Sequence, residues 1–329
     1  MSTPFPDALH SVLQGGTLPL HRARLALGAI IDGGTTAAQA GAFLGALALR
    51  GPAADELVGF GQALRERCVK VAVSRTPLLD TGGTSAAVAF IAAGAGAAVA
   101  EQVGRGLCGR PGLAEVLEIL EVRLDVSPED SRRCVEAVGI GFLPQQAFHP
   151  ALERVSPLRQ DLGVRTVFDL LTPLAHPAGA GRQLLGVPAA PLVPLLARAL
   201  KSLGSESAMV VSSRDGLCGF SLAAPTVVAH LRAGRIEEYE VDAAALGLQR
   251  RPAADCVSRG PAAEAALVLA TLKGERGPAY DAALLNAAAA LIVADLASDF
   301  KEGLARAAES VDSCRALQTL EAVKKLGRT

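Results

Sequence analysis

The chain has 329 residues, of which 50% are hydrophobic and 3% aromatic, and its 32 Lys and Arg residues face 33 Asp and Glu residues. This length and apolar content exclude an intrinsically disordered chain and allow two or three domains with a substantial core. The formal net charge of −1 lacks the positive field that is typical of a dedicated nucleic-acid binder. We therefore expect a soluble, globular protein.

Three further features concern the compartment. The N-terminal segment MSTPFPDALHSVLQGG has no basic stretch followed by an apolar run, so it does not resemble a signal peptide. The uncharged stretch 81–100 consists mainly of Ala and Gly, which favours a buried helix and strand over a membrane span. The six cysteines are Cys68, Cys108, Cys134, Cys218, Cys256 and Cys314. They show neither CxxC nor CxxH spacing, which argues against a zinc site or a disulfide scaffold. These features predict reduced thiols and a cytoplasmic protein.

The segment from His21 to Lys70 has a helical pattern. Gly33-Gly34-Thr35-Thr36 is typical of the end of one helix and the hydroxyl cap of the next. Gly51-Pro52 then separates the second helix from a third, which we expect over 54–68. The sequence therefore predicts an all-helical N-terminal unit.

The rest of the chain alternates between short and long apolar runs. The short runs at 97–100 and 208–212 indicate strands, whereas the run at 191–203 indicates a helix. The last part, 262–305, is rich in Ala and is expected to be helical. This alternation predicts an α/β fold.

One long segment carries a resemblance to a known family. Between Gly139 and Val187 the chain reads GIGFLPQQAFHPALERVSPLRQDLGVRTVFDLLTPLAHPAGAGRQLLGV. Its GIGFL, HPA, PxR, LGxRTxF and LLxPL motifs resemble those of anthranilate phosphoribosyltransferase. The similarity continues through Asp215-Gly216-Leu217, a segment at 226–234 that we expect to be a helix, and LLNAAAAL near the C-terminus. It covers almost the whole chain.

The resemblance implies a fold and a reaction. The fold would be α/β, with a small N-terminal helical domain and a larger α/β domain built on a central mixed sheet. We expect the helical domain over 1–70, completed by helices within about 150–175, and the α/β domain over 71–149 and 176–329. The family transfers a phosphoribosyl group from phosphoribosyl pyrophosphate (PRPP) to the amino group of anthranilate, with Mg²⁺ on the pyrophosphate. A homodimer through the N-terminal helices is also implied.

The donor side departs from the family's motifs. The segment that matches the family's phosphate-binding glycine loop is shorter than the loop of the family. Its candidate phosphate-binding residues are Asp80, Gly82, Gly83, Thr84 and Ser85. A helix N-terminus with two hydroxyls attracts anions, but Thr84 and Ser85 are also ordinary helix caps, and the cap interpretation is the stronger one. This segment is therefore a weak candidate for phosphate binding.

Other donor-side positions are replaced as well. Glu101 stands where the family has Lys, which would put a carboxylate toward a pyrophosphate unless it pairs with Arg105 or Arg110. Cys218 and Gly219 follow Asp215-Gly216-Leu217 in place of two acidic magnesium ligands. A thiol and a glycine do not hold a hard cation. We therefore predict no metal site, and Mg²⁺ as a cofactor only if the family's activity is retained.

The acceptor side departs less. Arg159 and His149 match family positions near the aromatic acid, and an Arg can bind a carboxylate through two parallel hydrogen bonds. The alternative is that Arg159 pairs with Asp161 or Asp169. Asp169 and Thr172 also replace the family's Asn and Gly. We predict that Arg159, His149, Arg105 and Arg110 surround a small anionic or aromatic ligand.

Three functions remain open. The first is a protein with this fold whose PRPP and magnesium site has degenerated, so that transfer is weak or lost and the cleft binds a different small ligand or has a non-catalytic role. The second is an active anthranilate phosphoribosyltransferase of tryptophan biosynthesis. The third is a nucleic-acid-binding paralogue, which would need one basic face formed by Arg105, Arg110, Arg132, Arg133, Arg250 and Arg251. The pattern of losses favours the first, and the balanced charge argues against the third.

Overall fold

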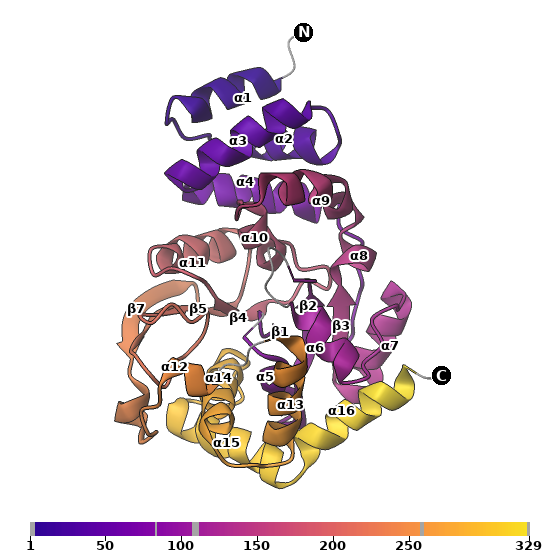
Figure 1. Cartoon of the computed structure of the whole chain (residues 1–329), viewed down its shortest axis with the longest axis vertical. Coiled ribbons are helices and arrows are strands. Elements are labelled where there is room, and N and C mark those ends of the chain that lie inside the picture. The colour runs from indigo at the N-terminus through magenta and orange to yellow at the C-terminus, as the bar shows by residue number, and fades with distance from the viewer. Residues whose placement is uncertain (1–3, 83, 107–111, 257–259, 328–329) are drawn as a thin grey trace.

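The computed structural model describes residues 4–82, 84–106, 112–256 and 260–327. A helical unit lies on top of a larger unit in which helices surround a sheet (Figure 1). No helix in these ranges is long and apolar enough to cross a membrane. The fold is the expected one, with a small N-terminal helical domain and an α/β domain around a mixed sheet.

The helical unit begins with four helices. They are α1 (Pro4–Leu13), α2 (Leu20–Ile31), α3 (Ala37–Arg50) and α4 (Ala54–Arg65). Thr36 caps α3 as predicted: its hydroxyl accepts from the Gln39 amide, and the Gln39 side chain accepts in return from the Thr36 amide. A later helix, α9 (Pro150–Leu162), packs on α2 and α3. This packing supports the domain division at about 70, 150 and 175, which stays a proposal.

Seven strands form one sheet. They are β1 (Leu78–Asp80), β2 (Ala98–Val103), β3 (Ile140–Pro144), β4 (Arg182–Gly186), β5 (Ser207–Ser213), β6 (Thr226–Arg232) and β7 (Arg235–Val241). Their order is β3-β2-β1-β4-β5-β6-β7. The pairs from β3 to β5 are parallel, and β5-β6 and β6-β7 are antiparallel. The parallel part positions the candidate site.

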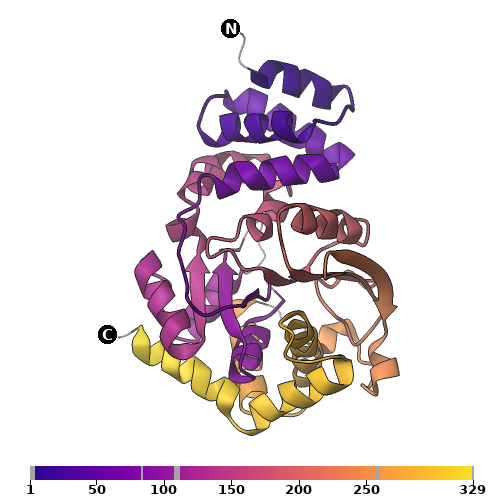
Figure 2. The same cartoon turned by 180° about the vertical axis from the view of Figure 1, so that it is seen from behind.

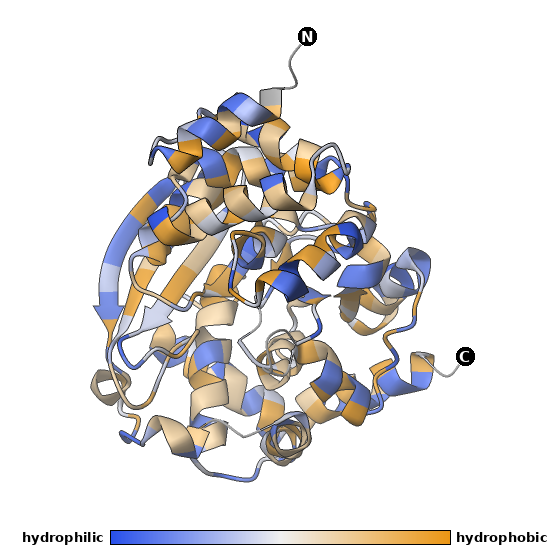
Figure 3. Ribbon diagram, turned by 45° about the horizontal axis from the view of Figure 1, so that its top comes forward, coloured by the Kyte–Doolittle hydropathy of each residue, from blue (hydrophilic) through white to orange (hydrophobic). Residues whose placement is uncertain are grey.

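The helix expected at 226–234 is wrong, because this segment forms the hairpin of β6 and β7. The two turn residues, Ala233 and Gly234, have φ of 49° and 73°, and a two-residue hairpin turn of this kind needs a positive φ at both central positions. β7 is one of the two edge strands and is mostly hydrophilic, as its blue ribbon shows (Figure 3). An edge strand that carries charge resists pairing with other chains.

The remaining helices cover the sheet and connect its strands. They are α5 (Ala86–Gly94), α6 (Leu113–Ile119), α7 (Pro128–Val138), α8 (Gln145–Phe148), α10 (Phe168–Leu171), α11 (Leu192–Ser202), α12 (Ala253–Cys256), α13 (Pro261–Leu272), α14 (Pro278–Val293), α15 (Phe300–Asp312) and α16 (Arg315–Leu326), with 3-10 turns η1 (Thr172–Ala175) and η2 (Ala243–Leu246). The Ala-rich stretch 262–305 is thus interrupted. It breaks at Gly274, where φ is 83°, and again before Asp299, whose side chain caps α15.

Helix α14 is buried along most of its length. Ala287–Ala290 are fully buried in it, and Asn286 is the polar residue beside them. α15 crosses it closely, because a Cβ added at Gly303 would lie 2.9 Å from the Cβ of Ala288. Small side chains on both helices therefore set the distance between α14 and α15.

Candidate functional site

The candidate site lies at the carboxyl ends of the parallel strands. β1 sits between β2 and β4, so the chain winds outward from β1 in one direction and from β4 in the other. Ligands of open α/β sheets bind at such a switch point, beyond the carboxyl ends of the strands. Asp80 ends β1 and Gly186 ends β4.

A cavity of about 90 Å³ opens beside these ends. It brings together Thr84 and Ser85, from the start of α5, with Cys218 and Gly219, from the loop after β5. The resemblance described above assigns these segments to the family's phosphate and magnesium positions. The fold thus places the altered donor-side residues around one space, although they lie far apart in the sequence.

Ser85 both caps α5 and lines this cavity. Its hydroxyl accepts from the Ala87 amide at 3.3 Å and donates to the Glu264 carboxylate at 3.5 Å. The Thr84 hydroxyl donates to the Thr81 carbonyl at 3.0 Å. Gly82 has a φ of 56°, and a Cβ there would lie 2.3 Å from the Leu184 carbonyl oxygen, so only glycine fits. Gly83 lies outside the described residues.

Asp80 is not among the residues that line the cavity. Its side chain is buried, and one oxygen accepts from the Gly82 amide at 3.1 Å. The other lies 3.9 Å from Nε2 of His176. That nitrogen donates to the Ala100 carbonyl, and burial lowers the pKa of His176, so the ring is neutral. Asp80 therefore supports the end of β1 from within the core.

Glu101 is also buried and holds the same strand end. One carboxylate oxygen accepts from the Thr81 amide at 2.8 Å and from the Thr81 hydroxyl at 2.6 Å. Arg105, an expected partner of Glu101, pairs instead with Glu118 at 2.5 Å. Arg110 and Cys108 lie outside the described residues. The carboxylate that replaces the family's Lys is thus bonded to Thr81 at the end of β1.

The loop after β5 does not fit a magnesium ion. Both oxygens of Asp215 accept bonds within the loop, one from the Leu217 amide at 3.1 Å and one from the Ser221 hydroxyl at 2.6 Å. Cys218 and Gly219 supply no carboxylate. In the described ranges no three His, Cys, Asp or Glu side chains form a group that could hold a metal. The donor set differs from the hard oxygen ligands that Mg²⁺ prefers.

Glu264 and Asn286 are polar residues of this cavity that sequence reasoning missed. Glu264 comes from α13 and reaches Ser85. Asn286 comes from α14, where its amide accepts from the Phe220 amide and donates to the Phe220 carbonyl, both at 2.9 Å. Its oxygen would also lie 3.0 Å from a Cβ at Gly219. The one polar residue in the run LLNAAAAL was the signal for Asn286, whereas nothing marked Glu264.

A second cavity, of about 330 Å³, lies between α9 and the loop after β2. Arg159 and Arg105 line it, together with Glu115 and Glu153. Arg159 is 9% exposed, and its Nη2 donates to the Asp169 carboxylate at 2.7 Å. Two arginines and two glutamates balance the charge of this space, so its potential is less positive than the sequence predicts.

His149 has a more structural position. It is buried and lines neither of these two cavities. Its Nε2 lies 3.1 Å from the Gln102 side-chain oxygen, and the Gln102 amide donates to the Thr172 carbonyl at 3.0 Å. Burial, with His176 nearby, lowers the pKa of His149 to about 4, so the ring is neutral. Nδ1 is buried and has no partner among the described residues.

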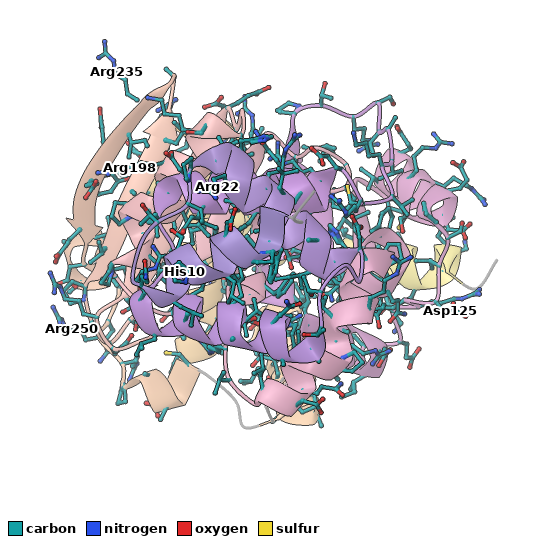
Figure 4. The ribbon with its side chains drawn as sticks, turned by 90° about the horizontal axis from the view of Figure 1, so that it is seen from above. His10, Arg22, Asp125, Arg198, Arg235 and Arg250 are labelled. Carbon is teal, nitrogen blue, oxygen red and sulfur yellow. The ribbon has the colours of Figure 1, made fainter. Side chains whose placement is uncertain are left out.

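Among the described residues, the arginines considered for nucleic-acid binding do not form one free basic face. Arg132, Arg133 and Arg250 each pair with a carboxylate within their own segment. Seen from above, Arg250 lies at the opposite edge of the molecule from Asp125, which precedes α7 (Figure 4). α7 carries Arg132 and Arg133, so these charges are both paired and separated.

Comparison with known proteins matches both units. Residues 80–317 match the model of the glycosyl transferase family, a/b domain, and residues 6–68 match the glycosyl transferase family, helical bundle domain. An anthranilate phosphoribosyltransferase of Anaeromyxobacter sp. (strain K) is 43% identical over 95% of this chain and 96% of its own length. One from Thermomicrobium roseum is 44% identical over 97% and 96%.

Solved structures agree with the sequence relatives. The crystal structure of anthranilate phosphoribosyltransferase from Thermus thermophilus is 35% identical, with a TM-score of 0.90 over 98% of this chain and 100% of that one. The Saccharomyces cerevisiae enzyme in complex with PRPP and Mg, 23% identical with a TM-score of 0.88 over 100% of this chain and 99% of that one, shares the fold. Through both its domains, this chain belongs to the anthranilate phosphoribosyltransferase family.

Proposed function

We propose that the protein transfers a phosphoribosyl group from PRPP to the amino group of anthranilate, at a turnover well below that of its relatives. The observation that carries the proposal is the cavity at the switch point of the sheet, between the N-terminus of α5 and the loop at Cys218. Full-length identity of 43% to an anthranilate phosphoribosyltransferase supports the reaction type.

The low turnover follows from the charges around the cavity. Pyrophosphate leaves with negative charge, and catalysis of such a step depends on positive groups and amides that face the departing oxygens. No Lys or Arg is among the described residues that line this cavity, and Glu264 adds a carboxylate. The first-turn amides of α5 and the Ser85 hydroxyl remain to hold a phosphate.

The residues around the cavity do not fit a protein-held magnesium ion, so the chain's own groups have to act without one. Ser85 would turn its hydroxyl from Glu264 toward a phosphate oxygen. Arg159 would orient the acceptor's carboxylate from the second cavity. Both groups bind and position, and neither offers a general base.

A second function is favoured by a specific observation. The ion pair of Arg159 with Asp169 occupies the acceptor-side guanidinium, while Cys218 and Gly219 leave the donor side without acidic ligands. Both changes weaken transfer and leave the two cavities in place. The second proposal is therefore a binding protein that holds a small aromatic or anionic ligand and does not turn it over.

The test is loss of anthranilate fluorescence with purified protein, PRPP and Mg²⁺, beside the Thermus thermophilus enzyme. We expect turnover about 10 to 1,000 times below that control, which corresponds to about 1.4 to 4 kcal/mol of transition-state stabilisation. Ser85→Ala should lower it further, whereas Ser313→Ala, at an exposed serine of the α15 end, should not. Saturable anthranilate binding without turnover would select the second function, and neither binding nor turnover would exclude both.

We also propose the homodimer through the N-terminal helices. Three leucines of these helices are exposed: Leu13 by 58%, Leu25 by 39% and Leu49 by 91%. Exposed aliphatic side chains on neighbouring helices support an interface that covers them.

A further inference from the structure

A third cavity, of about 320 Å³, lies away from the candidate site. Four segments build it: the end of α4, the connection that follows α4, the return connection at 176–181 and the loop at 203–205. The last two segments precede β4 and β5, so the cavity lies near the amino ends of these strands, whereas the donor-side cavity lies near their carboxyl ends. Figure 2 shows the connection after α4 running along the side of the molecule to β1.

The charged side chains that line this cavity are cationic. They are Arg65 and Lys70, and no Asp or Glu is among its described lining residues. Within the described part of the chain neither of them forms an ion pair. Arg65 donates from Nε to the Leu174 carbonyl at 2.6 Å and from Nη1 to the Leu203 carbonyl at 2.8 Å. These bonds fix the guanidinium and leave its charge without a counter-ion.

The positive charges of Arg65 and Lys70 both act on the Cys68 thiol. Burial raises the pKa of this thiol, and the two positive charges oppose that shift. Burial also lowers the pKa of Arg65 itself, which is the effect of taking a cation out of water. His176 lines the same cavity. Its Nε2 donates to the Ala100 carbonyl and its Nδ1 accepts from the Ala178 amide, so the ring carries one proton and is neutral. The charged lining residues therefore make the cavity positive, and the buried Asp80 carboxylate, 3.9 Å from Nε2 of His176, offsets part of that charge.

A second carboxylate, that of Glu206, lies close to the cavity and offsets its charge little. A Cβ at Gly181 would lie 3.3 Å from Cδ of Glu206, so that side chain passes near the wall. Its carboxylate lies 3.8 Å from Arg182 and is 67% exposed. Water screens such an exposed group, and Arg182 offsets its charge.

We propose that this cavity binds a phosphate group, either as inorganic phosphate or as part of a small phosphorylated metabolite. A fixed guanidinium and the ammonium of an exposed lysine on one space suit a tetrahedral oxyanion, since Arg supplies directed donors and Lys a point charge. Glycines at 179, 181 and 204 leave room beside them. A bound phosphate would connect the end of α4 to the segments at 176–181 and 203–205, which precede β4 and β5.

The experiment is calorimetric titration of the full chain with inorganic phosphate, at fixed ionic strength set by NaCl. We expect saturable binding that Lys70→Glu weakens at least fivefold, while Lys273→Glu, an exposed lysine outside the cavity, changes the dissociation constant less than twofold. Arg65→Lys keeps the charge and should weaken binding by a smaller factor than Lys70→Glu. If Arg65→Lys does not fold, the affinity of Lys70→Glu alone tests the proposal.

Two further arms separate this cavity from the donor-side cavity and identify the source of the phosphate. Ser85→Ala should leave the Lys70-dependent part of phosphate binding unchanged, because Ser85 belongs to the donor-side cavity and can affect only a phosphate bound there. Ribose 5-phosphate that binds at least fivefold more tightly than phosphate identifies a metabolite site, and equal affinity identifies free phosphate. No saturable binding, a loss below fivefold in Lys70→Glu, or loss of the Lys70-dependent binding in Ser85→Ala would overturn the proposal. None of these readouts depends on transfer activity.

Discussion

Arg159 and Asp169 form an ion pair that joins α9 to the start of α10, with 2.7 Å between Nη2 and Oδ1. The other oxygen of Asp169 accepts from the Thr166 amide at 2.8 Å, and the guanidinium lies 5.8 Å from the centre of the Phe168 ring. A ligand carboxylate that approaches Arg159 therefore meets a competitor that is already in place. The family resemblance implies Asn at this position, and an amide would not compete in the same way.

Replacing Asp169 with Asn should strengthen binding of anthranilate. The amide keeps a hydrogen-bond acceptor for Arg159 and removes the competing charge, so we expect the dissociation constant to fall at least fivefold, or about 1 kcal/mol. Fluorescence titration measures it. Asp161→Asn is the matched control, because Asp161 is exposed on the same helix as Arg159 and should leave the affinity unchanged. An unchanged or weaker affinity in Asp169→Asn would show that Arg159 has a structural role only.

Glu101→Lys should destabilise the protein without restoring turnover. The variant removes the acceptor of the Thr81 amide and hydroxyl, and it buries an ammonium group in its place. We expect the free energy of unfolding in urea to fall by about 3 kcal/mol or more. Glu238→Lys, at an exposed position of β7, should change it by less than about 0.5 kcal/mol. A stable Glu101→Lys variant with raised turnover would mean that Glu101 faces the donor.

Stability should fall as the pH is lowered from about 6.5 to about 4. The pKa of folded His149 is about 4, against an ordinary 6.5, so in this window the unfolded chain takes up a proton that the folded chain refuses. The loss from His149 alone is about 3 kcal/mol, complete below pH 4 and absent above 6.5. His176, whose pKa is also lowered, adds to the same slope.

Urea unfolding at several pH values measures this slope. His149→Gln, which keeps a donor for Gln102, should flatten it, while His10→Gln, at an exposed histidine of α1, should not. An identical slope in His149→Gln would place the acid sensitivity elsewhere.

The double variant Leu13→Arg with Leu49→Arg should shift the protein from dimer to monomer. Charges on an apolar interface lose solvation without gaining partners, so association weakens. Light scattering after size exclusion gives the mass at several concentrations. Ile119→Arg, at an aliphatic residue of α6 that is 48% exposed, is the control and should leave the mass unchanged. A wild-type monomer at all concentrations would exclude the interface.

Much of the fold could be predicted because local signals agree with the final packing. Thr36 after paired glycines predicted a helix start that the structure confirms, since a hydroxyl at this point satisfies an otherwise open amide. The hairpin at 226–241 differs from the helix that the family resemblance predicts for 226–234. The burial of β6 does not alternate, because Val227 and His230 lie on opposite faces of the strand and both are half-buried, so no simple period-two pattern marks this segment as a strand.

The candidate site could be predicted only in part. Ser85 and Cys218 were found from motifs, but Glu264 approaches Ser85 across 179 positions of sequence, and no local pattern marks such a contact. The partner of Arg159 was among two alternatives, because Asp161 and Asp169 are both near in sequence. In the folded chain Arg159 pairs with Asp169, whose carboxylate also accepts a hydrogen bond from the Thr166 amide.

The close crossing of α14 and α15 has a consequence for the loop after β5. The Asn286 side chain forms hydrogen bonds with both the amide and the carbonyl of Phe220. Asn286 also lies two positions before Ala288, the residue that Gly303 contacts. Any side chain larger than hydrogen at 303 would push α14 along its contact and carry Phe220 and its loop with it. Position 303 would then behave in a mutational survey like a ligand-binding residue, although it has no chemical group and touches no cavity described above.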